Sequence, residues 1–327
     1  MSDFLTSAGW AGATATPIAG DASARRYTRL TDGARTAILM QDPEGDVSVF
    51  ARLARHLSSM GLSAPQILAE DAASGLLLIE DLGDALFAKC VAENAALEGP
   101  LYILATDALL LLHRHPSPDD LPVADAGTLA QMTDLAFDWY AQRATGQPAN
   151  TARDACIAAL QDALARHAPE TDVMILRDYH AENLLWLPDR SGPARAGLLD
   201  FQDALQGHRA YDLASLVTDA RRDVSAPVAE AAIRHYLDGS GLSDAPFRAA
   251  LAVLSAQRNL RILGVFARLA ATRGKPHYVD LVPRVWAHLM QALDHPALDE
   301  VAPILRRGLP APTPAILDRL KSACPTP

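Results

Sequence analysis

The middle of the chain holds two short segments in which polar side chains follow apolar strands. Residues 176–183 read Leu-Arg-Asp-Tyr-His-Ala-Glu-Asn, and residues 198–203 read Leu-Leu-Asp-Phe-Gln-Asp. Transfer of a phosphoryl group from ATP needs one carboxylate to orient the acceptor hydroxyl, and an amide oxygen with a second carboxylate to hold magnesium. The pattern therefore predicts phosphoryl transfer, with Asp178 as the catalytic base and Asn183 and Asp200 as the metal ligands.

Each part of this pattern has an ordinary structural explanation when it is taken alone. An Asp after a strand is a common turn former, and an Asp and an Asn five residues apart occur by chance. The combination is more specific, because the Asp-x-His-x-x-Asn segment is followed by an apolar strand, a short turn and a second apolar strand that ends in Asp-Phe. We therefore favour the catalytic interpretation.

Short apolar runs are expected to position these residues. Runs over residues 173–176, 184–187 and 196–199 are bounded by polar residues or by Gly and Pro, which is typical of buried strands. A tight connection between the second and third strands would bring Asn183 and Asp200 to one rim.

The first hundred residues form a strand-rich region with one helix. Apolar and β-branched runs predict strands, and Thr31-Asp32-Gly33 predicts a hairpin turn between the first two. Residues 46–60 predict an amphipathic helix that ends at Gly61. The strands are expected at residues 26–30, 37–40, 66–69 and 76–79.

After Gly99-Pro100 the sequence is mostly helical. The length of 327 residues favours two domains, so we expect an α+β chain with an N-terminal domain over residues 1–83 and a larger C-terminal domain over residues 84–327. Helices are expected at residues 101–113, 129–143, 152–167, 211–220, 228–237, 245–273 and 278–293.

Composition disfavours several classes of protein. Half of the residues are apolar and 21% are charged, which is typical of a folded core. The 29 basic and 39 acidic residues give a net charge of −10, which is the wrong sign for a nucleic-acid-binding face. Three widely separated cysteines without a Cys-x-x-Cys pair indicate neither a disulfide framework nor a zinc ribbon.

Neither a targeting segment nor a membrane span is expected. Residues 1–20 contain no basic residue, unlike a signal peptide, and the apolar stretch over residues 101–112 is shorter than a span of about 20 residues. We therefore expect a cytoplasmic protein without a nucleic-acid or membrane partner, and nothing in the sequence implies a protein partner. The small-molecule substrate that we also expect follows from the resemblance described next.

The two polar segments resemble those of the aminoglycoside phosphotransferase and choline kinase superfamily, whose members are protein-kinase-like small-molecule kinases. The family's catalytic loop reads His-Gly-Asp-x-His-x-x-Asn, and its metal motif is an apolar strand that ends in Asp. The family also has an Asp-Leu-Ala helix start that supports the catalytic loop, and Asp212-Leu213-Ala214 matches it. The resemblance covers residues 18–293. It implies a two-lobed protein-kinase-like fold, with a small β-rich N-lobe and a larger, mostly helical C-lobe, and ATP and Mg²⁺ as cofactors.

Finer features are similar to one branch, the bacterial N-acetylmuramate/N-acetylglucosamine anomeric kinases. They lie at residues 20–27, 78–84, 177–180 and 207–223. The resemblance implies phosphorylation of the C1 hydroxyl of an amino sugar in cell-wall recycling. Two alternatives stay open: an aminoglycoside or choline-type alcohol kinase, and a catalytically silent nucleotide-binding pseudokinase.

The resemblance also implies nucleotide contacts. Residues 20–27 would form the turn that covers the phosphates, where the Ser23 hydroxyl and backbone N–H groups are suited to phosphate oxygens. The Glu80 carbonyl and the Leu82 N–H would pair with the adenine edge.

One group that kinases of this fold use is missing. They carry a strand lysine on the α- and β-phosphates, held by a helix glutamate. The only lysines here are Lys89, Lys275 and Lys321, and the expected strand position falls near Met40. We expect Arg25 or Arg26 to substitute, because alternate residues of a strand face opposite sides and one of the two would face the nucleotide.

Several residues are candidates for binding the acceptor. Arg258 or Arg261 could meet a sugar carboxylate such as the lactyl group of N-acetylmuramate. The alternative for these arginines is a salt bridge to Asp212 or Asp219 that supports the catalytic loop. The other acceptor-binding candidates are His180, Gln202, Asp203 and His208.

Overall fold

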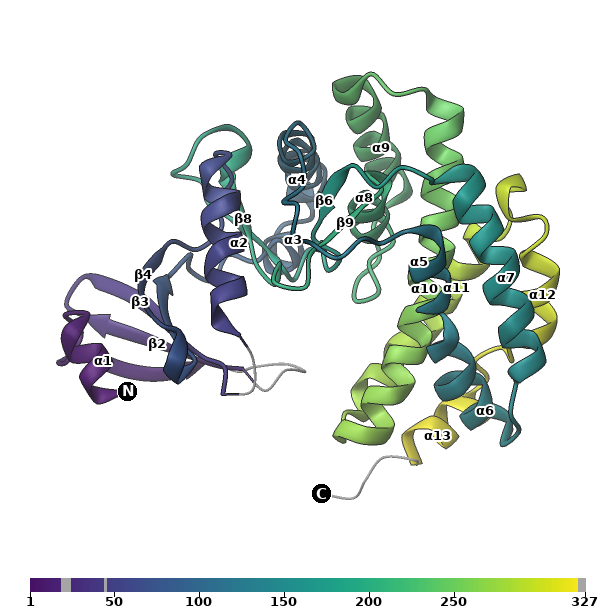
Figure 1. Cartoon of the computed structure of the whole chain (residues 1–327), viewed down its shortest axis with the longest axis horizontal. Coiled ribbons are helices and arrows are strands. Elements are labelled where there is room, and N and C mark those ends of the chain that lie inside the picture. The colour runs from purple at the N-terminus through teal and green to yellow at the C-terminus, as the bar shows by residue number, and fades with distance from the viewer. Residues whose placement is uncertain (19–24, 44–45, 323–327) are drawn as a thin grey trace. The chain divides into compact units, whose positions relative to one another are not determined.

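The computed structural model describes residues 1–18, 25–43 and 46–322, and the chain forms two compact units (Figure 1). The first unit comprises Met1–His115 and Ala181–Asp203, and the second comprises Pro116–His180 and Ala204–Pro327. The predicted catalytic segment therefore contributes residues to each unit, because its residues up to His180 belong to the second unit and those from Ala181 belong to the first. The lobe boundary expected after Gly83 does not coincide with a unit boundary, and it stays a prediction.

The described part of the first unit contains a five-stranded antiparallel sheet. The predicted hairpin is confirmed, since β2 and β3 pair from Arg26 opposite Gln41 to Asp32 opposite Arg35, and Gly33 adopts a φ of +59° in the turn. Strand β1 was not among the strands expected from the sequence. The strands lie in the order β1 (Thr14–Ile18), β2 (Arg26–Asp32), β3 (Arg35–Gln41), β5 (Leu76–Glu80) and β4 (Ile67–Asp71).

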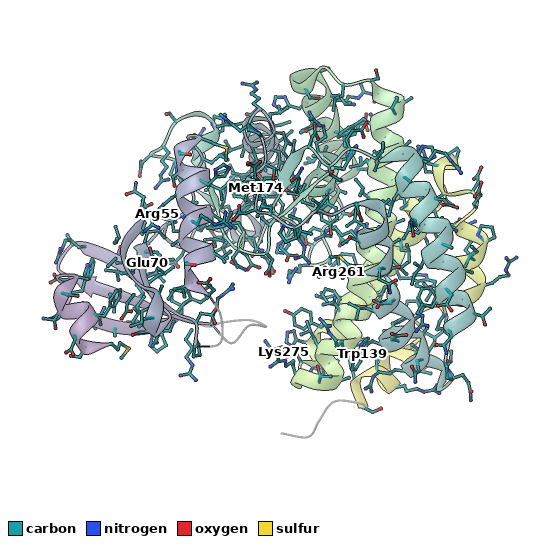
Figure 2. The ribbon with its side chains drawn as sticks, viewed as in Figure 1. Arg55, Glu70, Trp139, Met174, Arg261 and Lys275 are labelled. Carbon is teal, nitrogen blue, oxygen red and sulfur yellow. The ribbon has the colours of Figure 1, made fainter. Side chains whose placement is uncertain are left out.

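Different helices pack on the two faces of this sheet. On one face Trp10 packs with buried Leu30, Leu39 and Leu78, beside residues of α1 (Ser2–Ser7). Side chains alternate along β3, so Met40 points to the other face. Helix α2 (Val47–Ser59), capped by Asp46, lies against β4 and β5 and is the predicted amphipathic helix. Figure 2 labels the Arg55–Glu70 ion pair that joins α2 to β4 at 2.7 Å.

The segment Ala181–Asp203 completes the first unit. Strands β7 (Leu184–Trp186) and β8 (Ala196–Leu198) pair antiparallel, as the apolar runs predict. The Ser63 hydroxyl donates to the Ala194 carbonyl at 2.5 Å, and the rings of Phe50 and Phe201 lie 4.7 Å apart. These contacts attach the segment to the region around α2. Helix α3 (Phe87–Glu93) packs against β7, and α4 (Glu98–Leu112) packs against β8.

Among the described residues, one helical stretch, Ala95–Leu112, is long and apolar enough to cross a membrane by length and composition alone. Its side chains Tyr102, Ala105 and Leu109 are fully buried within the protein. We therefore interpret it as a core helix, because the interior helix of a folded domain has the same composition.

Helix α10 (Asp244–Arg273) is the central element of the second unit. It packs against α7 (Asn150–His167), α8 (Ala210–Val217) and α11 (Val282–Ala292). Strand β6 (Val173–Ile175) pairs with β9 (Leu205–Gly207), a strand that the sequence analysis does not include. The unit also contains α9 (Ala226–Ser240), α12 (Ala302–Gly308) and α13 (Pro314–Ser322).

The single helix predicted over residues 129–143 is wrong. The structure instead has α5 (Ala126–Gln131), the π-helical segment η3 (Ala136–Ala141) and α6 (Gln142–Thr145). Two contacts explain the interruption. The Thr133 hydroxyl donates to the Ala130 carbonyl at 2.6 Å near the end of α5. Gly264 of α10 approaches the backbone just before η3 so closely that a Cβ there would lie 2.2 Å from the Leu135 carbonyl carbon.

Candidate active site

One rim of the first unit carries the two predicted metal ligands. Asn183 precedes β7 and Asp200 follows β8, and the antiparallel pairing of Leu184 with Leu198 brings both to the same end of the ladder. Asn183 Nδ2 lies 3.4 Å from Asp200 Oδ2. Asp200 has a φ of +57°, a conformation that non-glycine residues seldom adopt outside turns and functional sites. The structure therefore brings the two side chains together.

Gln202 extends this set of oxygen donors. Its Nε2 donates to Asp200 Oδ1 at 2.7 Å, and its buried Oε1 has no hydrogen-bond partner among the described residues. Mg²⁺ binds carboxylate and amide oxygens together with substrate phosphates. Rotation of an amide exchanges its nitrogen and oxygen, so the donor set at this rim fits Mg²⁺. No group of three His, Cys, Asp or Glu side chains within the described ranges forms a metal site by itself.

Of the two candidate arginines, Arg25 is the one on the side of this rim. Arg25 Nε donates to Asp42 Oδ2 at 2.7 Å, whereas the Arg26 side chain is exposed. Burial lowers the pKa of Arg25, but the hydrogen bond to Asp42 and the charges of Tyr27, Asp42 and Asp203 raise it above its ordinary value. The carboxylate of Asp203 is therefore part of the surroundings of Arg25. Ser23 lies outside the described residues.

Two arginines that were not among the predicted site residues hold the end of β5 and the segment that follows it. Arg29 of β2 donates to Asp81 and to both carboxylate oxygens of Asp84, at distances of 2.9–3.0 Å. Arg190 donates to Glu80 Oε1 at 2.6 Å. Leu82 lies between these anchored residues. The structure thus fixes the segment predicted to contact adenine, and that contact stays a prediction.

In the second unit the predicted base follows a tight turn. The Asp178 N–H donates to the Leu176 carbonyl at 2.9 Å, and Arg177 between them has a φ of +71°. A hydrogen bond from residue i+2 to residue i with a positive central φ marks the rare, strained form of the γ-turn. The strain falls on the residue immediately before Asp178.

Asp212 holds this turn, as the Asp-Leu-Ala motif implies. Its Oδ2 accepts from the Leu176 N–H at 2.6 Å, and its Oδ1 accepts from the Arg177 N–H at 2.8 Å. The side chain has 0% exposure. Burial raises the pKa of Asp212 to about 7, against the effect of the two N–H donors and of the charge of Arg258. Asp212 therefore connects α8 directly to the backbone that carries Asp178.

A basic cluster, whose His180 and Arg258 side chains are buried, lies beside the same turn. Arg221 Nη1 lies 3.1 Å from His180 Nε2, and because a guanidinium can only donate, the imidazole proton is on Nδ1. Burial, followed by the charges of Arg221 and Arg258, holds the pKa of His180 well below its ordinary range. The His180 ring is therefore neutral. Its remaining N–H makes it a donor beside the catalytic turn.

Two arginines of α10 belong to this cluster. Arg258 is only 3% exposed, and its Nη1 has no hydrogen-bond partner among the described residues. No salt bridge joins Arg258 to Asp212 among the described residues, although the charge of Arg258 lowers the pKa of Asp212. Figure 2 labels Arg261, one turn further along α10, whose pKa is lowered chiefly by burial and also by Arg177 and Arg258.

His208 has a role that the sequence analysis did not foresee. Its Nδ1 accepts from the Ala210 N–H at 3.0 Å at the start of α8, and its Nε2 lies 3.3 Å from Glu170. Both ring nitrogens therefore have partners within the second unit. This arrangement suits a helix cap better than contact with a sugar hydroxyl.

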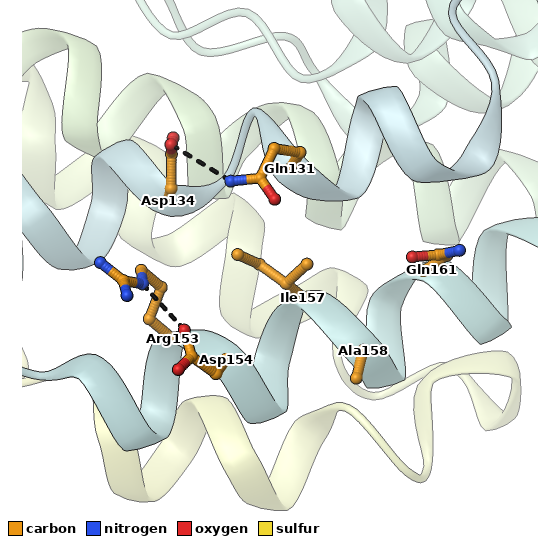
Figure 3. Close-up of a pocket in the computed structure, with 7 residues that line it drawn as sticks. All are labelled: Gln131, Asp134, Arg153, Asp154, Ile157, Ala158 and Gln161. Atoms are coloured by element: carbon orange, nitrogen blue, oxygen red, sulfur yellow. Dashed lines mark hydrogen bonds and ion pairs between the residues drawn. The ribbon is translucent and has the colours of Figure 1, made fainter.

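A wide hollow of about 510 Å³ lies elsewhere in the second unit, along α5 and α7 (Figure 3). Arg153 at its edge binds Asp154 at 3.0 Å and Asp138 at 3.1 Å. Gln131 and Asp134 face it from the other side. None of the predicted site residues lines this hollow, so it is not the candidate active site.

Similarity to known proteins identifies the family of the chain. The profile described as Phosphotransferase enzyme family matches residues 14–252, well over half of the chain. The chain belongs to this family. The N-acetylmuramate/N-acetylglucosamine kinase of Caulobacter vibrioides is 36% identical over 95% of this chain and 96% of its own length. The protein of the same name from Pseudomonas aeruginosa is 33% identical over 88% of this chain and 87% of its own length.

The family membership and the fold agree. A solved structure of a choline/ethanolamine kinase family protein from Mesorhizobium loti matches 94% of this chain and 97% of its own, with a TM-score of 0.65 and 17% identity. The likeness confirms the expected two-lobed, protein-kinase-like α+β fold. As a member of the phosphotransferase family, the chain is an enzyme.

Proposed function

We propose that this phosphotransferase moves the γ-phosphate of ATP to the C1 hydroxyl of N-acetylmuramate or N-acetylglucosamine. The observation that carries the choice of acceptor is the similarity, almost from end to end, to the Caulobacter kinase named for these two sugars. The role would be recovery of cell-wall amino sugars, in the cytoplasm.

The residues around the strained turn support this reaction. Phosphoryl transfer depends mostly on positioning and charge stabilisation, and we assign to Asp178 the acceptance of the sugar hydroxyl proton. Asp212 fixes the backbone before Asp178 through two hydrogen bonds of 2.6 and 2.8 Å. His180, neutral and with its proton on Nδ1, is a suitable donor to a sugar oxygen.

The rim of the first unit supplies the metal and nucleotide side of the proposal. Asn183 and Asp200 would hold Mg²⁺, with Gln202 and Asp203 next to them on the same segment. Bound there, Mg²⁺ would neutralise charge on the β- and γ-phosphates. Ser23 and an arginine would cover the phosphates, and Glu80 and Leu82 would contact adenine.

Arg258 is the residue that we assign to an acidic acceptor. A buried guanidinium stays charged, and a cation with an unpaired N–H in the interior is destabilising unless an anion completes it. The carboxylate of N-acetylmuramate would do so, whereas N-acetylglucosamine carries none. Arg258→Met should therefore raise KM for N-acetylmuramate and leave KM for N-acetylglucosamine nearly unchanged. Equal losses on both sugars would instead favour a supporting role beside Asp212.

The decisive experiment is an acceptor panel. ADP release is measured with ATP and Mg²⁺ in the presence of the two amino sugars, choline or an aminoglycoside. We expect turnover on the amino sugars, loss of their reducing-end reactivity as C1 is phosphorylated, and a kcat at least 100-fold lower, roughly, for Asp178→Asn. Turnover on choline or the aminoglycoside alone would contradict the proposed amino-sugar acceptor. Nucleotide binding without turnover on any acceptor would favour the pseudokinase alternative.

A further inference from the structure

The sheet position at which kinases of this fold carry a lysine is predicted to fall near Met40, an apolar side chain. Met40 lies in β3, has 0% exposure and stands opposite Tyr27 of β2. The chain has no lysine before Lys89. A cation that serves the phosphates must therefore reach this face from another position.

The strand register places one arginine on that face. Residues directly opposite one another in an antiparallel pair point to the same side, as do alternate residues along a strand. Arg25 lies two residues before Tyr27, and Asp42 lies two residues after Met40. All four side chains consequently share the face opposite to Trp10 and α1. Arg26 pairs with Gln41 and points the other way.

Arg25 and Asp42 form a tight ion pair on this face. Arg25 Nε lies 2.7 Å from Asp42 Oδ2, with the two side chains 20% and 7% exposed. In protein kinases the strand lysine is likewise held by a carboxylate, the glutamate of a helix. Here the carboxylate comes from the residue after β3, which agrees with the absence of a glutamate in α2.

The backbone of Asp42 is fixed by the turn before β5. The Asp42 N–H donates to the Gly75 carbonyl at 2.9 Å, and a Cβ on Gly75 would lie 2.3 Å from the Asp42 carbonyl oxygen. Gly75 also has a φ of +66°. Only glycine satisfies both conditions without strain. Asp42 is therefore a rigid anchor for the arginine.

The predicted metal-binding segment lies near the same face. The charges of Asp203 and Asp200 act on Arg25 and Tyr27 respectively. Four residues after Arg25, in the middle of β2, Arg29 holds the segment predicted to contact adenine. Four residues of strand span about 13 Å, which is comparable with the length of an extended ADP. Arg25 thus stands where the phosphates would lie if the adenine were near Arg29.

We propose that Arg25 takes the place of the strand lysine and contacts the α- and β-phosphates, and that Asp42 is the positioning residue that replaces the helix glutamate. A guanidinium has five N–H donors in a planar fork, so an arginine bound through Nε to a carboxylate can also donate to phosphate oxygens. This inference rests on the proposed use of ATP, and it is independent of the identity of the sugar.

The test compares nucleotide binding by calorimetry for the whole protein and four variants: Arg25→Ala, Arg25→Lys, Asp42→Asn and Arg26→Ala. Loss of charge-assisted hydrogen bonds to phosphate should weaken ADP binding about 10- to 100-fold in Arg25→Ala, and less in Arg25→Lys. Asp42→Asn should weaken ADP binding while the protein stays folded, as shown by circular dichroism. Arg26→Ala is the matched control and should bind ADP as the wild type does.

Two further measurements separate a phosphate contact from a general loss of structure. Adenosine, which has no phosphate, should bind Arg25→Ala and the wild type equally. Arg25→Ala combined with Asp42→Asn should be no weaker for ADP than Arg25→Ala alone, because Asp42 acts through Arg25. In steady-state kinetics, KM for ATP should rise and KM for the sugar should not.

The outcomes distinguish the proposed nucleotide contact of Arg25 from the proposed amino-sugar acceptor. Unchanged ADP binding in Arg25→Ala, an equal loss in Arg26→Ala, or no ADP binding by the wild type would overturn the assignment of Arg25. Wild-type binding of ADP with the expected order of variants, but without turnover on either amino sugar, would overturn the proposed acceptor and support the nucleotide contact.

Discussion

Removal of the Asp212 carboxylate should damage both the stability and the activity of the protein. In Asp212→Ala the N–H groups of Leu176, which is buried, and of Arg177, which is partly buried, lose their acceptors. Each unsatisfied buried donor costs about 1–3 kcal/mol, so the free energy of unfolding should fall by about 2–6 kcal/mol. Asp212→Asn keeps one acceptor oxygen and should lose about half as much. Unfolding in urea measures both values.

The activity effect follows from the strain at Arg177. Its φ of +71° is held by the Asp212 hydrogen bonds, and without them the turn should relax and displace Asp178. We expect kcat to fall in Asp212→Asn while KM for ATP changes little. Arg177→Gly in that background should restore part of kcat, because glycine adopts a positive φ without strain.

Three results would refute this reasoning. The first is a destabilisation of less than about 0.5 kcal/mol in Asp212→Ala, which is typical of an ordinary surface change. The second is an equal kcat for Asp212→Asn and the wild type. The third is a failure of Arg177→Gly to improve the Asp212→Asn enzyme, measured as a double-mutant cycle in which neighbouring residues normally couple by about 0.5–3 kcal/mol.

Three other predictions concern packing and charge. Gly264→Ala should lower the free energy of unfolding by at least about 1–3 kcal/mol, because the new Cβ would overlap the backbone that leads into η3; unchanged urea unfolding would contradict this. Gly75→Ala should weaken ADP binding by displacing the anchor of Arg25, whereas Gly241→Ala, with a similar φ of +69° but open space around it, should not; equal calorimetric affinities for the two variants would contradict it. Hydrogen bonds from arginines, chiefly Arg248, lower the pKa of Glu230 from 4.5 to about 2, so this carboxylate stabilises the protein above pH 4.5 and loses that effect as the pH falls toward 2. Glu230→Gln should therefore lower the free energy of unfolding by less than about 1 kcal/mol at pH 6, since the pair is partly exposed, and by less at pH 3; an equal difference at both pH values would count against it.

Local patterns predicted the elements that carry the site. The apolar runs over residues 184–187 and 196–199 became β7 and β8, and their pairing puts Asn183 beside Asp200 as the spacing indicates. The amphipathic helix with its Asp46 cap and the β2–β3 hairpin also follow from neighbouring residues. Such features depend on interactions over a few positions, which a sequence displays directly.

Features that depend on distant residues could not be predicted in this way. The break of the expected helix at residues 129–143 depends on Gly264, more than a hundred positions later. The anchoring of Glu80 by Arg190 joins segments of similar separation. Asp42 is a partial exception, because extension of the hairpin register by one pair from Arg26 and Gln41 would have placed it opposite Arg25.

The division of the first unit into Met1–His115 and Ala181–Asp203 has a consequence for synthesis on the ribosome. At about 5–20 residues per second, the 88 residues between positions 115 and 203 take roughly 4–18 s to add. During that time Phe201 and Ala194, which contact Phe50 and Ser63 in the folded protein, have not yet been synthesised. The second unit needs α10, which is made later still. The nascent chain therefore exposes apolar surface that is not yet buried for many seconds. The yield of folded protein should respond to the speed of translation and to the supply of chaperones.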